Sequence, residues 1–147
     1  MTLAAHVCVY VYGSNDLARS AYDVDLDQRV PIGSAEVVRD MQRFLDFVAE
    51  ERSEHSLPMP RIHVVPVLAR PAWGGRQMTE AVLLNNAVAR HPHVTSMVFM
   101  PWYDRFKHVA ERSIGGRVDG KHLHPQLYPL LLDSIKREVA SHSDTWF

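Results

Sequence analysis

Three apolar runs alternate with three amphipathic segments along the chain. The runs cover residues 6–12, 61–65 and 94–100, and they are rich in valine. Such runs are typical of strands that are covered on both faces in a parallel sheet. The amphipathic segments follow the runs, at about 34–54, about 77–90 and from 125 onward. Strands that alternate with helices predict βαβ units and a parallel sheet with right-handed crossovers.

Each predicted helix has an apolar stripe with residues three and four positions apart. Ser34 is the expected N-cap of the first helix, and Pro125 suits the first turn of the last one. Asn85 falls on the stripe of the second helix, so it needs hydrogen-bond partners if it is buried. The stripes consist of Val37, Val38, Met41, Phe44, Leu45 and Val48; of Met78, Ala81, Val82 and Val88; and of Leu127, Leu130, Leu131, Ile135 and Val139.

An irregular stretch follows each predicted strand. Residues 13–33 show no sustained period, and a structureless stretch of that length is usually functional or mobile. Pro66 has no amide hydrogen, so the second strand is expected to end there. Residues 66–75 and 102–118 follow the second and third strands. Because ligands bind beyond the carboxyl ends of the strands in open parallel sheets, these stretches are the place to look for a site.

Asp119 and His122 are the candidate catalytic pair. The sequence Asp-Gly-Lys-His at 119–122 places a carboxylate three positions before an imidazole, just ahead of the last helix. A histidine serves as a general base near neutral pH when a carboxylate fixes its tautomer and stabilises its charged form. We therefore expect Asp119 and His122 to lie within hydrogen-bond reach. Asn15 follows the first predicted strand, so we expect it on the same rim, because the loops after parallel strands meet at the carboxyl edge of the sheet.

Two motifs in this order resemble the SGNH (GDSL-type) hydrolases, a family of serine esterases and lipases. The first is Gly-x-Asn-Asp at residues 13–16, and the second is Asp-x-x-His-x-x-Pro at residues 119–125. The resemblance implies one domain over residues 1–147 with a three-layer α/β/α, flavodoxin-like parallel sheet. It also implies that Asn15 donates its side-chain amide to the oxyanion hole, that His122 is the base and that Asp119 is the acid of the triad. Such a site acts on a small acyl ester without a cofactor.

The nucleophile of that family is missing from its usual place. The family carries its serine in a Gly-Asp-Ser motif on the first strand, and this motif does not occur in the 147 residues. We expect either an N-terminally truncated piece or a relative that has lost its nucleophile. Ser14 lies inside the oxyanion-hole loop, and Cys8 lies in a predicted strand, so neither is a good substitute and the nucleophile is unknown.

Two functions therefore stay open. One is an esterase or lipase-like hydrolase that is complete only when an upstream segment supplies the serine. The other is a pseudoenzyme, a catalytically inactive module that keeps the fold for binding or assembly. In the family's strand order, the strand from His6 to Tyr12 becomes an edge of this chain, and no lysine, proline or internal charge blunts it. We expect this edge to pair with a second copy, with another chain or with an N-terminal segment of a longer parent.

Composition narrows the classes of partner. Hydrophobic residues make up 46% and charged residues 22%, which is ordinary for a globular domain. The 16 basic and 17 acidic residues give a formal charge of −1, which predicts no binding to nucleic acid or acidic membranes. The sequence contains neither the roughly 18 apolar residues of a membrane span nor a signal peptide. Cytoplasmic or nuclear residence is the default expectation, unless a truncated start has removed a targeting sequence.

Nine histidines raise the question of a metal site. Two His-x-His pairs occur, at 91–93 and 122–124, but no Cys or Glu cluster accompanies either of them. Zinc sites usually need three or four ligands, so we expect no metal here. The aspartates at 23, 25 and 27 lack the glycine and the terminal glutamate of an EF-hand loop, which favours a solvated loop.

Overall fold

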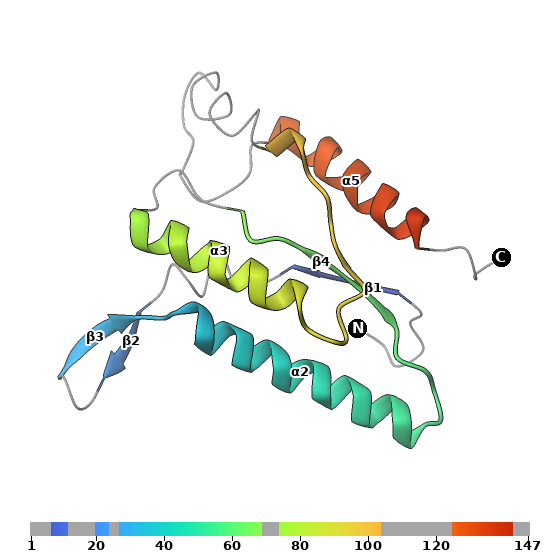
Figure 1. Cartoon of the computed structure of the whole chain (residues 1–147), viewed down its shortest axis with the longest axis horizontal. Coiled ribbons are helices and arrows are strands. Elements are labelled where there is room, and N and C mark those ends of the chain that lie inside the picture. Colours follow the sequence, from blue (N-terminus) through green and yellow to red (C-terminus); the bar gives the residue numbers. More distant parts are fainter. Residues whose placement is uncertain (1–6, 12–19, 24–26, 69–73, 104–124, 143–147) are drawn as a thin grey trace.

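A computed structural model of the chain describes residues 7–11, 20–23, 27–68, 74–103 and 125–142. The described part holds five strands, three α-helices and one short 3-10 helix (Figure 1). In chain order these are β1 (Val7–Val11), β2 (Ser20–Asp23), β3 (Gln28–Pro31), α2 (Ser34–Glu54), β4 (Arg61–Val65), α3 (Gly75–Ala89), β5 (Ser96–Met97), η1 (Pro125–Leu127) and α5 (Tyr128–Ser141).

The three predicted strands form one parallel sheet in the order β1-β4-β5. β1 pairs with β4 over its whole length, from Val7 opposite Arg61 to Val11 opposite Val65. β5 pairs with β4 through Ser96 and Met97 only. β4 ends at Val65, so the prediction that Pro66 stops this strand is confirmed.

One apolar core joins α2 and α3 to the sheet. α2 and α3 lie side by side in Figure 1 and contact each other along their length. Their buried side chains meet Ile62 and Val64 of β4. The helix residues in this core are Val37, Met41, Leu45, Ala81, Leu84 and Val88. Burial of a leucine or valine side chain contributes about 1.5–3 kcal/mol, so this cluster is the main source of stability in the described part.

α5 lies on the other side of the sheet from α2 and α3 (Figure 1). It contacts β4, where the ring of His63 faces the ring of His142 at the end of the helix. The fold therefore has a small parallel sheet and three helices, as the alternating pattern predicts. The complete three-layer, flavodoxin-like arrangement stays a prediction.

The start of α2 differs from the prediction. Ser34 is not the N-cap but the first helical residue, and the N-cap is Gly33. The carboxylate of Glu80 on α3 takes over the capping role, because its Oε2 accepts a hydrogen bond of 2.6 Å from the Ser34 amide. Hydrogen bonds from the side chain and then the backbone of Ser34 lower the pKa of Glu80. A tertiary contact thus replaces the local cap.

The buried face of α3 is rotated from the predicted stripe. Ala81 and Val88 are buried as predicted, but Met78 and Val82 are 39% and 57% exposed. Leu84 is fully buried instead, because it lies three positions after Ala81 and four before Val88 on the face that meets α2. The segment has apolar residues on several faces, so its periodicity does not single out the buried one.

The prediction that residues 13–33 carry no regular structure is wrong. β2 and β3 pair antiparallel, from Ser20 opposite Pro31 to Asp23 opposite Gln28. Asp27 in the connection has a φ of 48°, which aspartate tolerates better than most residues. The hairpin is a separate sheet near the start of α2 (Figure 1). Of the suggested aspartate row, residue 25 lies outside the described residues.

The third predicted strand is much shorter than residues 94–100. β5 comprises Ser96 and Met97, and the amides of Thr95 and Val98 extend the pairing by donating to Ile62 O and Val64 O, both at 2.8 Å. Val98 is buried, but Phe99 is 73% exposed. Among the described strands β5 has a neighbour on one side only, which is β4.

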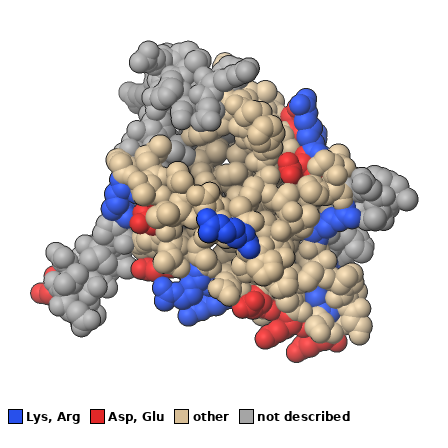
Figure 2. Space-filling view, in the orientation of Figure 1, with Lys and Arg blue, Asp and Glu red and all other residues tan. Residues whose placement is uncertain are grey.

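Lysine and arginine side chains alternate with aspartate and glutamate on the face shown in Figure 2. This mixture agrees with the formal charge of −1. None of the helices in the described ranges combines the length and the apolar character that crossing a membrane requires.

Replacing Glu80 by alanine is expected to destabilise the chain by about 1 kcal/mol, the usual effect of losing a helix cap. The measurement is urea unfolding of wild type, Glu80→Ala and, as a control, Glu54→Ala at the exposed far end of α2. Because folding lowers the pKa of Glu80, its contribution is present above about pH 4.5 and is lost as pH falls through the folded value. Equal unfolding midpoints for wild type and Glu80→Ala at neutral pH would contradict this capping role.

Candidate functional site

The sequence-predicted site residues lie outside the described residues. These are Asn15 and Ser14 after β1, and Asp119 and His122 before η1. The structure therefore leaves their mutual geometry as a prediction. It does define the elements that flank them in the sequence. β1 ends at Val11, four positions before Asn15, and η1 begins at Pro125, three positions after His122.

The described strands deliver the chain to one edge of the sheet. β1 and β4 run parallel and in register, so Val11 and Val65 end side by side. β5 runs in the same direction on the other side of β4. The segments that continue from these three strands therefore all start at the carboxyl edge, which is where open sheets bind ligands.

Asn85 fixes the chain where it leaves β4. Its Oδ1 accepts a hydrogen bond of 2.8 Å from the Val67 amide, and its Nδ2 donates one of 3.1 Å to the Val67 carbonyl. Val67 is itself buried. Asn85 is half-buried and has the hydrogen-bond partners that burial was expected to require. These two hydrogen bonds hold the first residues of the loop after β4 against α3.

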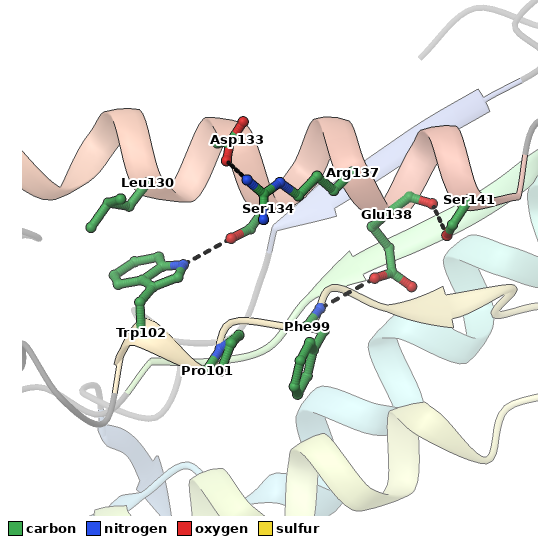
Figure 3. Close-up of a pocket in the computed structure, with 9 residues that line it drawn as sticks. All are labelled: Phe99, Pro101, Trp102, Leu130, Asp133, Ser134, Arg137, Glu138 and Ser141. Atoms are coloured by element: carbon green, nitrogen blue, oxygen red, sulfur yellow. Dashed lines mark hydrogen bonds and ion pairs between the residues drawn. The ribbon is translucent and has the colours of Figure 1, made fainter.

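A groove of about 540 Å³ lies between the segment after β5 and α5 (Figure 3). Two hydrogen bonds cross it. Trp102 Nε1 donates to Ser134 Oγ at 2.8 Å, and the Phe99 amide donates to Glu138 Oε2 at 3.4 Å. Further along the helix, Arg137 and Asp133 form an exposed ion pair at 3.1 Å. Two polar contacts thus join the walls of the groove.

His63 is a buried histidine that the pattern did not single out. It is fully buried, and its Nδ1 lies 2.8 Å from Ser96 Oγ on the neighbouring strand. Its Nε2 has no hydrogen-bond partner among the described residues. Burial lowers the pKa of His63, the positive charges of His142 and Arg61 lower it further, and Glu138 acts in the opposite direction. The signal in the sequence is a single His inside an apolar strand.

A serine hydroxyl beside an imidazole is also the arrangement of a nucleophile and its base. The pair of Ser96 and His63 does not serve that purpose, because His63 has no exposed surface for a substrate to reach. Its hydrogen bond joins β5 to β4 and fixes the orientation of the ring. The pair is therefore structural.

No group of three or more metal-binding side chains occurs in the described ranges. The pair at 91–93 makes a local contact, in which the His93 amide donates to His91 Nδ1 at 3.1 Å and the two rings lie 5.6 Å apart. One ring nitrogen of His91 is therefore already an acceptor. The pair at 122–124 lies outside the described residues.

Asn85→Ala is expected to free the Val67 amide and carbonyl, and to cost about 2 kcal/mol because buried groups lose their partners. The measurement is hydrogen exchange at Val67 together with the unfolding free energy. Asn86→Ala, at the exposed neighbouring position, is the matched control and should leave both unchanged. If the Val67 amide exchanged at the same rate in Asn85→Ala as in wild type, the two hydrogen bonds of Asn85 would not hold this loop.

No family model matches the sequence, and neither a curated protein nor a solved structure matches the chain. The function has to be inferred from the chain's own residues and from their placement.

Proposed function

We propose that the chain carries the base and the oxyanion-hole part of an SGNH (GDSL-type) hydrolase domain, a serine esterase or lipase-like scaffold for a small acyl ester. The observation that carries this proposal is the in-register parallel pairing of β1 with β4. This pairing brings the chain to the carboxyl edge of the sheet only four positions before Asn15. The same edge is where an open sheet binds ligands.

The strand order gives further support. In the SGNH arrangement the three strands of this chain are contiguous and parallel, and the order β1-β4-β5 agrees with that arrangement. α2 and α3 pack against one side of β4, and His142 at the end of α5 approaches His63 from the other. These contacts support three layers with the last helix opposite the first two.

The proposed reaction is acyl transfer to a serine followed by hydrolysis. His122 takes the proton from the serine hydroxyl as its oxygen attacks the ester carbonyl, and Asp119 orients the imidazole and stabilises its charged form. Asn15 and backbone amides stabilise the oxyanion. The alcohol leaves with the proton that His122 returns, and a water activated by His122 then releases the acid. No step requires a cofactor, but the serine belongs to a Gly-Asp-Ser segment that this sequence does not contain.

A second candidate is a non-enzymatic binding or assembly module. The observation that favours it is the open edge of β1, which among the described strands pairs with β4 alone. The composition of β1 predicts cover on both faces, but the side chain of Val9 is 38% exposed. An uncharged edge of this kind accepts a further strand from a second copy or from another chain.

The 147-residue chain alone is expected to hydrolyse short acyl esters no faster than buffer does, because a base and its orienter without a nucleophile give little catalysis. The measurement is release of a chromogenic alcohol from an acetyl or butyryl ester. Turnover that is lost in His122→Ala or in Ser14→Ala would overturn the view that the site is incomplete.

A longer polypeptide that joins the chain to an upstream Gly-Asp-Ser strand is expected to be an esterase. In that protein Asn15→Ala should lower kcat by about 10²–10³-fold, the usual loss for one oxyanion-hole donor. Asn86→Ala on the exposed face of α3 is the control. Activity that persists in His122→Ala, or the absence of any activity in such a protein, would remove the hydrolase proposal and leave the assembly module.

The open edge predicts self-association of the isolated chain. Val9→Lys should shift it toward monomer in sedimentation, because a lysine on an edge strand opposes pairing. Val82→Lys, at an exposed position of α3, is the matched control and should leave the distribution unchanged. A wild-type chain that sediments as a stable monomer, with fast amide exchange along β1, would refute pairing through this strand.

A further inference from the structure

α5 is attached to the sheet layer through a polar stripe. Ser134, Glu138 and His142 recur every four residues and so share one face of the helix. Each of them meets a group from the sheet or from the segment that follows it. Ser134 accepts from Trp102, Glu138 accepts from the Phe99 amide, and the ring of His142 lies 5.4 Å from that of His63 (Figure 3 shows the first two contacts).

Apolar burial is weaker at α5 than at α2. No residue of α5 is fully buried, whereas α2 has four buried apolar residues. Leu130, Leu131, Ile135 and Val139 are half-buried, and Tyr128 and Leu132 are 47% and 53% exposed. Since apolar burial contributes about 25 cal/mol per Å², this partial cover gives only part of the attachment. The docking of α5 therefore also depends on the polar stripe.

The contact between His63 and His142 is the part of the stripe that responds to protons. In the neutral ring Nδ1 is paired with Ser96, and Nε2 has no partner among the described residues. A protonated ring would carry a second N–H and a positive charge in a fully buried site. Burying an unpaired charge is strongly unfavourable, so the docked state requires the neutral ring.

The charges around His63 reinforce this preference. From α5 it faces His142 and Glu138, and along β4 it lies near Arg61. Its register partners are Ser96 on β5 and Val9 on β1, which are uncharged. Glu138 is the one group here whose charge favours a protonated His63, but its carboxylate is already shared between His142 Nε2 at 3.5 Å and the Phe99 amide.

We propose that protonation of His63 releases α5 from the sheet, so that the helix is docked at neutral pH and undocks in mildly acidic solution. A released α5 exposes His63 to water, where it accepts the proton readily. The groove between α5 and the segment after β5 opens in the same step. The inference does not depend on the hydrolase proposal, since docking is measured directly.

The direction follows from the pKa of His63, which burial lowers from its ordinary value of 6.5. Above that value both states hold a neutral ring, and protonation of His63 does not oppose docking. As pH falls below it, the released state gains a proton that the docked state refuses. The docking equilibrium then weakens by up to about tenfold per pH unit until the folded pKa is reached.

The test is hydrogen exchange of the full chain at about pH 7.5 and about pH 5.5, with rates corrected for intrinsic exchange. Protection of the α5 amides is expected to fall by up to about tenfold in acid, while protection of α2 stays constant. His63→Gln, which keeps an acceptor for Ser96 but does not titrate, should abolish the fall. His91→Gln is the control, because the pKa of His91 is also lowered by burial but its turn lies outside the stripe.

A second measurement keeps the proposal testable if His63→Gln does not fold. The ring signals of His63 in the wild-type chain should titrate at the same pH at which α5 loses protection. Constant α5 protection between the two pH values would overturn the proposal. So would a His63 titration that leaves α5 protection unchanged, or an undiminished fall in a folded His63→Gln.

Discussion

β4 is the element on which the described structure depends. It pairs with β1 on one side and β5 on the other, and Ile62, His63 and Val64 in its middle are almost fully buried. Because side chains alternate along a strand, Ile62 and Val64 face the helices α2 and α3 while His63 faces α5. One five-residue strand thus fixes the sheet order and sets what each layer packs against.

Different interactions attach the helices to the two sides of β4. On the side of α2 and α3 an apolar core excludes water, and its contribution changes little with pH. On the side of α5 a row of hydrogen bonds and a pair of histidine rings supplement side chains of the helix that are only partly buried. The last helix is therefore the one whose position depends on protonation. In the proposed hydrolase it directly follows the catalytic base, so the site would be the most responsive part of the fold.

The sequence predicts elements well where local pattern and packing agree. The bounds of α2 and β4 follow from a single apolar stripe and from Pro66. Prediction fails where a distant partner decides. Glu80 replaces Ser34 as the cap across 46 positions, and the face of α3 is chosen by contact with α2. The hairpin of β2 and β3 has no apolar alternation strong enough to reveal it.

The candidate site shows the same division. The motifs at 13–16 and 119–125 can be recognised because their residue types carry chemistry. The parallel pairing of β1 and β4 supports the proposal that they share one edge of the sheet. His63 could not be read as a docking residue, because Ser96 and His142 lie far along the chain and a lone His in a strand has many roles. The spacing of residues in the sequence can reveal a motif whose members are close in the chain. It does not reveal a contact between residues that are far apart in the chain and meet only in the folded structure.

The central claim is that the carboxyl edge of this sheet gathers Asn15 and His122. The most direct measurement is the paramagnetic broadening of the His122 ring signals in NMR spectra. A nitroxide is attached to a cysteine in Asn15→Cys, and Cys8→Ser removes the native thiol so that only this position is labelled. The His122 signals are identified by their absence in His122→Gln. The control carries the nitroxide at Glu54→Cys, at the C-terminal end of α2. The account predicts that the label at position 15 broadens the His122 signals and that the label at position 54 leaves them sharp. Sharp His122 signals with the label at position 15 would contradict it.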